Sequence, residues 1–350
     1  VWVGGAEKAT ALSFSARQGD TTVQFQGTAA HDLSLIGKIS LDKLDSSALQ
    51  PYLQPYLKAN RAVQVSGGKT RLVMQVNPLL KQYKVDELTM DQPRFVLADS
   101  KDNSGMKSGT NRLPLSVRPG QLFDPASLPF DLMIHHLTIN KGAVHEEQEN
   151  GPLWEELHLE LTDYQNRETP SSVKGQAKKA TALSFSARQG KTTLQFQGTA
   201  APDLSLTGKI SLNNLNPSLL QPYPNAREDL LLAGGQTEVS GLLRTVQAKE
   251  GGKKKILIDK GTITLRDISL KRKEQGKDEA LLTAQTAESK GCSIDLDPAS
   301  PSLSCADLLL SKAEFSSEAP SFFLFPEQAE SALGLSVDAV KITDSTAGLR

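Results

Sequence analysis

Apolar and polar residues alternate along several short segments of the chain. In Leu33–Leu41, leucine or isoleucine occupies most odd-numbered positions, while serine and lysine occupy most positions between them. Because successive side chains of a β-strand point to opposite faces, this alternation predicts a strand with one apolar and one polar face. Further strands are predicted at Thr22–Gln26, Ile134–Ile139, Leu157–Leu161, Ile256–Ile258 and Gly261–Leu265.

The chain contains an internal duplication. Residues Ala9–Gly19 recur letter for letter as Ala180–Gly190, an offset of 171, and the match continues with interruptions to Tyr52 and Tyr223. Such a long match cannot arise by chance, so the chain is built from repeats.

The duplication supports the assignment of the strand faces. Leu33–Leu41 corresponds to Leu204–Leu212, and all four Leu and Ile residues predicted on the apolar face are identical in the second copy. Ile36 is the one large apolar residue on the polar face, and its counterpart is Thr207. The side predicted to meet water therefore tolerates a polar replacement.

Short intervals rich in Gly, Asn and Asp separate the predicted strands, which favours an antiparallel sheet over parallel β-α-β units. One short helix is predicted in each repeat. In the first copy Asp45–Ser47 supplies capping side chains before Ala48, and Asn216–Ser218 plays this part in the second. The prediction is a mainly β protein.

A weaker echo of the repeat aligns Leu137–Gly142 with Val340–Ser345. On this register we expect the sequence to be an excerpt of a longer repetitive chain. Its expected parts are a partial first repeat unit at 1–127, a complete second unit at 128–330 and the start of a third at 331–350.

Composition excludes several classes of protein. The 350 residues are 38% hydrophobic and 23% charged, which is enough for a sizeable core and argues against disorder throughout. Lys and Arg number 39 against 40 Asp and Glu, so no long-range field gathers phosphates and we expect no nucleic-acid partner. No apolar run is long enough to cross a bilayer. Any membrane anchor is expected outside this sequence.

The only two cysteines are Cys292 and Cys305. They are close enough along the chain to form a disulfide in an oxidising compartment, and two unlinked thiols are the alternative. A structural zinc site needs four ligands, and the nearest histidine is His158, so we expect no such metal.

The chain shows no arrangement of residues typical of catalysis. His135 and His136 are neighbours on a predicted strand, so they point to opposite faces and cannot bind one metal together. His31 is replaced by Pro202 in the second copy. Gly67–Thr70 resembles the end of a phosphate-binding loop but lacks its earlier glycine. We therefore expect no enzyme, no metal and no cofactor.

The apolar face of the predicted sheet needs a cover. Leaving one Leu, Ile or Phe side chain in water costs about 1.5–3 kcal/mol, and the predicted helices are too few to shield the face. A second sheet would give a dry sandwich, which periodicity alone favours. The other cover is an apolar ligand on a curved open sheet, which repetition favours because stacked units extend one surface.

Four segments give the repeat a recognisable order. They are an Ile-Asn-Lys-Gly-Ala-Val strand at Ile139–Val144, the strand Leu-Ser-Leu-x-Gly-Lys-Ile-Ser-Leu, a Leu-Gln-Pro-Tyr helix at Leu49–Tyr52 and Leu220–Tyr223, and a following Val-Ser-Gly. This succession resembles the AsmA-like bacterial envelope proteins, in particular their large repetitive members of unknown function related to TamB and YhdP. The resemblance covers roughly residues 3–67, 128–241 and the start of a unit near 331.

The resemblance implies an elongated, curved, taco-like antiparallel β-sheet whose apolar groove carries phospholipid acyl chains between the inner and outer membranes. It also implies a periplasmic protein anchored to the inner membrane through an N-terminal segment absent from this sequence. The implied lipid-binding residues are Leu12, Phe14, Val23, Phe25, Leu33, Leu35, Ile39 and Leu41 in the first copy, and Leu183, Phe185, Leu194, Phe196, Leu204, Leu206, Ile210 and Leu212 in the second.

Two alternative functions follow, depending on whether an apolar ligand or a second sheet covers the apolar face. The first is non-enzymatic phospholipid binding and transport along an apolar β-groove. The second is a structural or adhesin-like β-repeat scaffold with a dry sandwich core.

Overall fold

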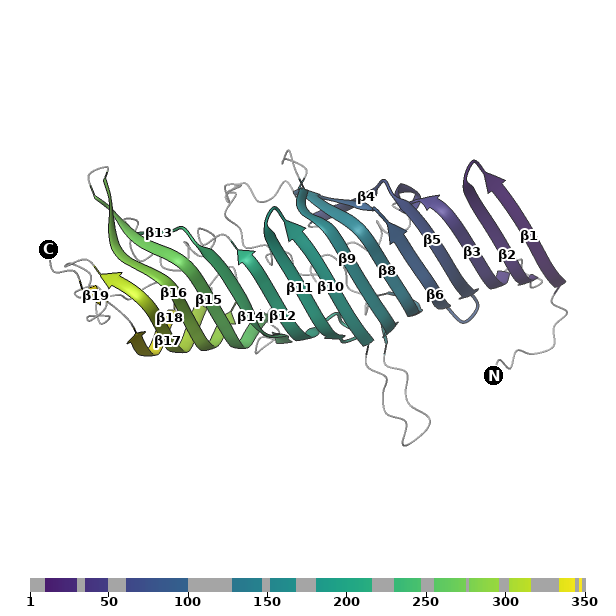
Figure 1. Ribbon diagram of the computed structural model, residues 1–350. Helices are drawn as coiled ribbons and strands as arrows, with labels where there is room; N and C mark the ends of the chain where they lie inside the picture. The colour runs from purple at the N-terminus through teal and green to yellow at the C-terminus, as the bar shows by residue number, and fades with distance from the viewer. Residues whose placement is uncertain are drawn as a thin grey trace, which may run out of the picture. The chain divides into compact units, whose positions relative to one another are not determined.

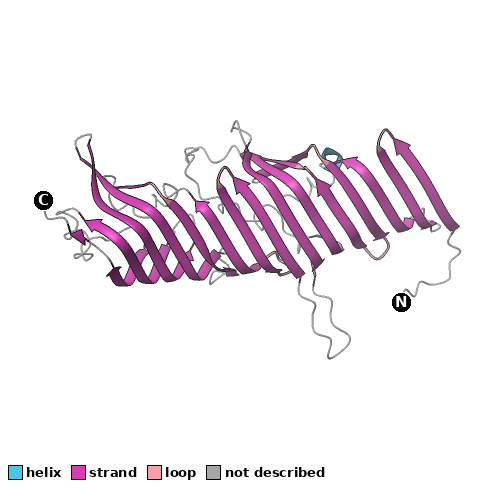
Figure 2. Ribbon diagram, in the orientation of Figure 1, coloured by secondary structure: helices cyan, strands magenta, loops and turns pink. Residues whose placement is uncertain are grey.

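The protein is mainly β, and within each of its two units the described strands pair in a mostly antiparallel manner (Figure 1, Figure 2). The computed structural model describes residues 10–29, 35–49, 61–99, 128–146, 152–167, 181–215, 230–246, 255–274, 277–295, 302–315, 334–343 and 346–347. The described strands divide between two compact units, and the division runs through β11 (Thr192–Ala200).

The first unit contains β1 to β10. Their bounds are β1 (Thr10–Gln18), β2 (Thr21–Ala29), β3 (Leu35–Asp45), β4 (Arg61–Ser66), β5 (Lys69–Asn77), β6 (Gln82–Asp91), β7 (Arg94–Asp99), β8 (Asp131–Glu146), β9 (Pro152–Gln165) and β10 (Thr181–Gln189). Hydrogen-bonded neighbours run β1, β2, β3, β5, β6, β8, β9, β10, while β4 pairs with β7 and β7 with β8. Pairing is antiparallel except where β6 and β7 lie parallel to β8.

The second unit contains β12 to β19. Their bounds are β12 (Leu206–Leu215), β13 (Leu230–Ala233), β14 (Gln236–Val246), β15 (Lys255–Glu274), β16 (Lys277–Asp295), β17 (Ser302–Phe315), β18 (Gly334–Thr343) and β19 (Thr346–Ala347). The hydrogen-bonded neighbours run β12, β14, β15, β16, β17, β18. β13 pairs with residues 269–272 of β15. Here the parallel pairs are β17 with β18 and β17 with β19.

The prediction of one short helix per repeat is wrong for the described residues. In the described part of the first copy there is a single 3₁₀ turn, η1 (Ser46–Leu49), while residues 50–52 and the counterparts Asn216–Ser218 and Leu220–Tyr223 lie outside the described residues. The Asp45 carboxylate accepts hydrogen bonds from the Ser47 amide at 2.9 Å and hydroxyl at 2.7 Å, which begins the turn. Pro51 follows almost at once, and its missing amide proton does not favour continuation as an α-helix.

Residues with left-handed backbone interrupt the long strands and keep one face apolar. On β12, the buried side chains of Ile210, Leu212 and Leu215 are spaced by two and then three positions. The pairing with β14 shifts between Leu212 and Leu215, where Asn214 adopts a φ of 54°. Such a β-bulge inserts one extra residue, so the buried side chains before and after it still point to the same face of the sheet.

The same device joins two segments that were predicted as separate strands. Ile256–Ile258 and Gly261–Leu265 both belong to β15, which is continuous over 20 residues. Lys260, with a φ of 50°, forms the bulge between them, and the pairing with β16 shifts at this point. The predicted break is therefore a bend within one strand.

One buried apolar cluster of the second unit lies on β15, β16 and β17. It consists of Ile268, Leu282, Ala284, Ala287, Leu310 and Ala313, with Leu265, Leu270 and Leu308 packed against it. A disulfide joins Cys292 on β16 to Cys305 on β17, with an S–S distance of 2.17 Å. Both sulfur-bearing residues are buried, so this cross-link belongs to the packed interior.

Candidate functional site

The predicted lipid-binding residues of the first copy stand side by side in the sheet. Phe14 on β1 pairs with Phe25 on β2, and Phe25 pairs with Ile39 on β3. Directly opposed residues of antiparallel strands project from the same face, so these three side chains form a row. The rings of Phe14 and Phe25 stack with their centroids 5.6 Å apart.

This row continues across the first unit through residues that the sequence did not single out. Ile39 pairs with Met74, Met74 with Val85, and Val85 with Ile134. A second row crosses from β2 to β10 on the same pairings. It consists of Val23, Leu41, Leu72, Leu88, Leu137, Leu161 and Leu183. One face of this unit is thus apolar from strand to strand.

The apolar face of the first copy is only partly shielded from water. Phe25 is buried at 3% exposure, whereas Leu12 and Phe14 on β1 are 37% and 45% exposed. Val23, Ile39 and Leu41 lie between these limits. Leu33 lies outside the described residues, and of Leu35 only the backbone is described.

Most of the equivalent residues of the second copy are more deeply buried, although Phe196 matches Phe25 at 3% exposure. Leu183 is 9% exposed, against 37% for its counterpart Leu12. Ile210 and Leu212 are 2% and 4% exposed, whereas Ile39 and Leu41 are half-buried. Leu194, Phe196 and Leu206 are also buried, and Phe185 and Leu204 are half-buried. Identical side chains therefore meet different environments in the two copies.

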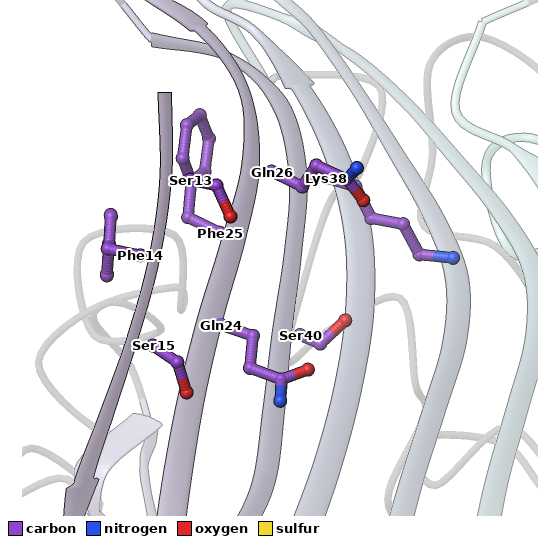
Figure 3. A pocket seen from close by; sticks show the side chains of 8 residues that line it. All are labelled: Ser13, Phe14, Ser15, Gln24, Phe25, Gln26, Lys38 and Ser40. Atoms are coloured by element: carbon purple, nitrogen blue, oxygen red, sulfur yellow. The ribbon is translucent and has the colours of Figure 1, made fainter. Parts of the chain in front are cut away.

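Eight residues, six of them polar, line a shallow hollow over β1, β2 and β3 (Figure 3). Ser13 pairs with Gln26 and Ser15 with Gln24, so these polar side chains alternate with Phe14 and Phe25 and occupy the opposite face. Ser40 and Lys38 continue the polar set on β3. Phe14 and Phe25 complete the lining, so the hollow offers neutral hydrogen-bonding groups, one lysine and two phenylalanines, without a carboxylate or imidazole among its lining residues.

Three of the described histidines, His135, His136 and His145, lie beside polar side chains. His135 Nδ1 lies 3.1 Å from an Asp163 carboxylate oxygen, and His136 Nε2 lies 2.9 Å from the Thr138 hydroxyl. Burial lowers the pKa of His145, and the nearby Arg94 guanidinium lowers it further. In the described part of the chain, His, Cys, Asp and Glu nowhere gather in a group of three able to hold a metal ion.

The two faces define what the arrangement can do chemically. An apolar face can hold an apolar group by dispersion and exclusion of water, which are non-directional, and the polar face carries hydroxyl and amide groups. Among the described residues, no helix has the length and hydropathy of a membrane span.

The sequence missed most of the central part of the apolar face. Leu72, Met74, Val85 and Leu88 lie in β5 and β6, outside the duplicated segment. Alternation of apolar residues in Leu72–Val76 was a usable signal for β5.

Comparison with protein-family models, with curated proteins and with solved structures finds no match to this chain. The geometry of the two faces is therefore the ground on which a function is proposed.

Proposed function

We propose that this protein binds phospholipid acyl chains on the apolar face of its sheet and conducts them between the inner and outer membranes of a bacterial envelope. The observation that carries the proposal is the unbroken row from Val23 to Leu183 across the first unit. A second observation supports it: Leu12 and Phe14, on the same face, are 37% and 45% exposed. An apolar surface of this kind favours an apolar occupant over water.

The mechanism needs no chemical step. Each methylene removed from water contributes about 0.8 kcal/mol, so a chain of many methylenes gains enough to stay on the face. Because this attraction has no preferred direction, an acyl chain can slide from one row of side chains to the next without breaking specific bonds. The charged headgroup would remain in water at the rim of the sheet.

The disulfide between Cys292 and Cys305 supports the proposed compartment. Disulfides form and persist in oxidising environments such as the bacterial periplasm and are rare in the cytosol. A periplasmic location, with a membrane anchor supplied elsewhere in the full protein, is part of the proposal.

Site-specific photo-crosslinking tests lipid contact. Phe14 and Ser13 are neighbours on β1 that project to opposite faces, and both are exposed. With the photoreactive residue p-benzoylphenylalanine at either position in bacteria labelled with radioactive phosphate, irradiation should transfer label at position 14 and not at position 13. Equal transfer at both positions, or none at position 14, would refute lipid contact through this face.

Substitution tests occupancy in the purified protein. Ile39→Asp places a charge in the apolar row, while Ser40→Asp places the same charge on the opposite face one residue further on. We expect lipid mass spectrometry to find phospholipid in the native protein and in Ser40→Asp, and much less in a folded Ile39→Asp. Absence of stoichiometric phospholipid from the native protein contradicts the proposal.

A specific observation favours a second function, a structural scaffold. In the second copy, Ile210, Leu212 and Leu215 are 2%, 4% and 1% exposed, which is typical of a dry core. The described strands do not, however, form the second sheet that a sandwich requires. A protein purified free of lipid, with unchanged stability after delipidation, would favour the scaffold.

A further inference from the structure

Two strands of the first unit have the same sequence and different neighbours. β1 and β10 both read Thr-Ala-Leu-Ser-Phe-Ser-Ala-Arg-Gln. β10 pairs with β9 along one edge. β1 pairs with β2, and no other described strand pairs with it; it lies at an edge in Figure 1. The second copy therefore displays an edge contact that the first copy lacks among the described residues.

The β9–β10 contact has three specific elements. Leu183 pairs with Leu161, and Phe185 pairs with Leu159, so the apolar rows continue from one strand to the other. Arg188 forms ion pairs with Glu155 at 3.3 Å and Glu156 at 2.8 Å. Backbone hydrogen bonds thus hold the two strands together, while the two leucines and the two glutamates of β9 determine which residues face each other.

On β1 the equivalent groups face solvent. All nine residues of the strand are exposed, including Leu12 at 37% and Phe14 at 45%. Arg17, the counterpart of Arg188, donates from Nε to the carbonyl oxygen of Gly19 at 2.9 Å, within its own turn. The groups that β9 engages on β10 are therefore accessible on β1.

The β1 edge also lacks the features that usually block strand addition. Natural edge strands are protected by proline, by several charges or by bulges. β1 contains no proline and a single charge, Arg17, and its pairing with β2 runs without a register shift from Thr10 to Gln18. A regular edge of this length with a single charge is a template for another strand.

We infer that the free edge of β1 binds an antiparallel strand with the residue pattern of β9, supplied by another repeat unit of the same kind. In the bound register a leucine equivalent to Leu161 stands opposite Leu12, one equivalent to Leu159 stands opposite Phe14, and an acidic pair meets Arg17. The apolar face then continues from one repeat to the next. This inference holds independently of lipid binding, since it concerns the backbone edge and not the occupant of the face.

A peptide with the sequence of residues 152–165, labelled with fluorescein, is the probe. Fluorescence anisotropy with the whole protein should show saturable binding. Replacing the two leucines equivalent to Leu159 and Leu161 with aspartate should abolish binding. Replacing Glu155 and Glu156 with glutamine in the peptide should weaken binding about 2–5-fold, as expected for an exposed ion pair.

Arg17→Gln is the matched change in the protein. Because the Arg17 side chain is exposed, this substitution should leave the fold intact, and weaker peptide binding cannot be attributed to unfolding. Arg17→Gln should weaken binding of the native peptide by the same factor and leave binding of the glutamine peptide unchanged. If the two weakening effects simply multiply, Arg17 does not meet the acidic pair and the proposed register is overturned.

Disulfide trapping measures the register directly. Directly opposed β-residues have Cα atoms about 4.5–5.5 Å apart, within reach of a disulfide. Leu12→Cys should trap a peptide carrying Leu161→Cys, whereas Ala11→Cys, on the other face, should not. Equal trapping at both positions overturns the inference. The inference is also overturned if two molecules dimerise through β1 and the peptide does not compete with the dimer, because the β1 edge would then prefer the same edge of a second molecule.

Discussion

Leu212 and Leu215 lie three positions apart on β12, yet both are buried, with exposures of 4% and 1%. Their partners on β14, Val239 and Thr237, are two positions apart and therefore share a face. Asn214 makes this possible, since its left-handed backbone inserts one residue without turning the strand over. Repetition of such bulges at Lys43, Lys141 and Lys260 lets long strands bend while one face stays apolar.

The bulge at Asn214 predicts a specific pattern of stability. Asn214→Val should lower the free energy of unfolding by about 1–2 kcal/mol, because a β-branched residue is strained at a φ of 54°. Asn214→Gly should be neutral or stabilising, since glycine adopts this backbone freely. Urea unfolding followed by circular dichroism measures both. Equal effects of the two substitutions would exclude backbone strain as the cause.

The disulfide predicts a dependence on reductant. Removing the cross-link with Cys292→Ala and Cys305→Ala together should lower the free energy of unfolding by about 3 kcal/mol, because the unfolded chain gains freedom in the loop between them. Dithiothreitol should shift the urea midpoint of the native protein and leave that of the double variant unchanged. A native midpoint insensitive to complete reduction would contradict this prediction.

Hydrogen exchange should distinguish the two identical strands. Ala9–Gly19 and Ala180–Gly190 have the same sequence, so intrinsic amide exchange rates match closely and any difference reports protection. We expect faster exchange in β1, whose outer edge is open, than in β10, which pairs with β9. Peptides that extend to Asp20 or Lys191 differ in mass and can be followed separately by mass spectrometry. Equal protection would show that the β1 edge is already occupied.

The turn at η1 predicts an acid-dependent effect. Hydrogen bonds from the Ser47 hydroxyl and amide hold the pKa of Asp45 below its ordinary value of 3.8. The charged carboxylate is therefore favoured in the fold, so its stabilising contribution is present above pH 3.8 and is lost as pH falls below it. Ser47→Ala should raise the pKa of Asp45 towards 3.8, measured by NMR titration of the carboxyl carbon, whereas Ser47→Thr should keep it low. An unchanged pKa in Ser47→Ala would show that the hydroxyl bond does not matter.

A pair of glycines predicts a site intolerant of side chains. Gly27 and Gly37 stand opposite each other on β2 and β3, and a Cβ on Gly27 would lie 2.6 Å from the Gly37 Cα and 2.9 Å from the Phe25 ring. Gly27→Ala should cost about 1–3 kcal/mol of stability through this overlap. At Gly19 a Cβ meets open space, so Gly19→Ala should show only the strain of its φ of 59°. Thermal unfolding of the two variants provides the comparison.

Alternation of side chains predicted the strand positions well, because a strand's two faces follow directly from its sequence period. The residue pairs that make up the rows could not be predicted, because neither the alignment of Met74 with Ile39 nor that of Val85 with Ile134 follows from local sequence. The predicted helix failed for a related reason. Capping side chains at Asp45 mark where a turn begins but do not specify its length.

The amino-acid sequence alone determined the β character, the duplication and the two faces of each strand, since these depend on residue order and stereochemistry. Tertiary structure decided how much water each residue meets. Phe14 and Phe185 occupy identical local sequences, yet Phe14 is exposed on an edge strand while Phe185 is half-buried beside β9. Burial depends on neighbours brought together by strand pairing, and identical sequences carry no information about which neighbours those are.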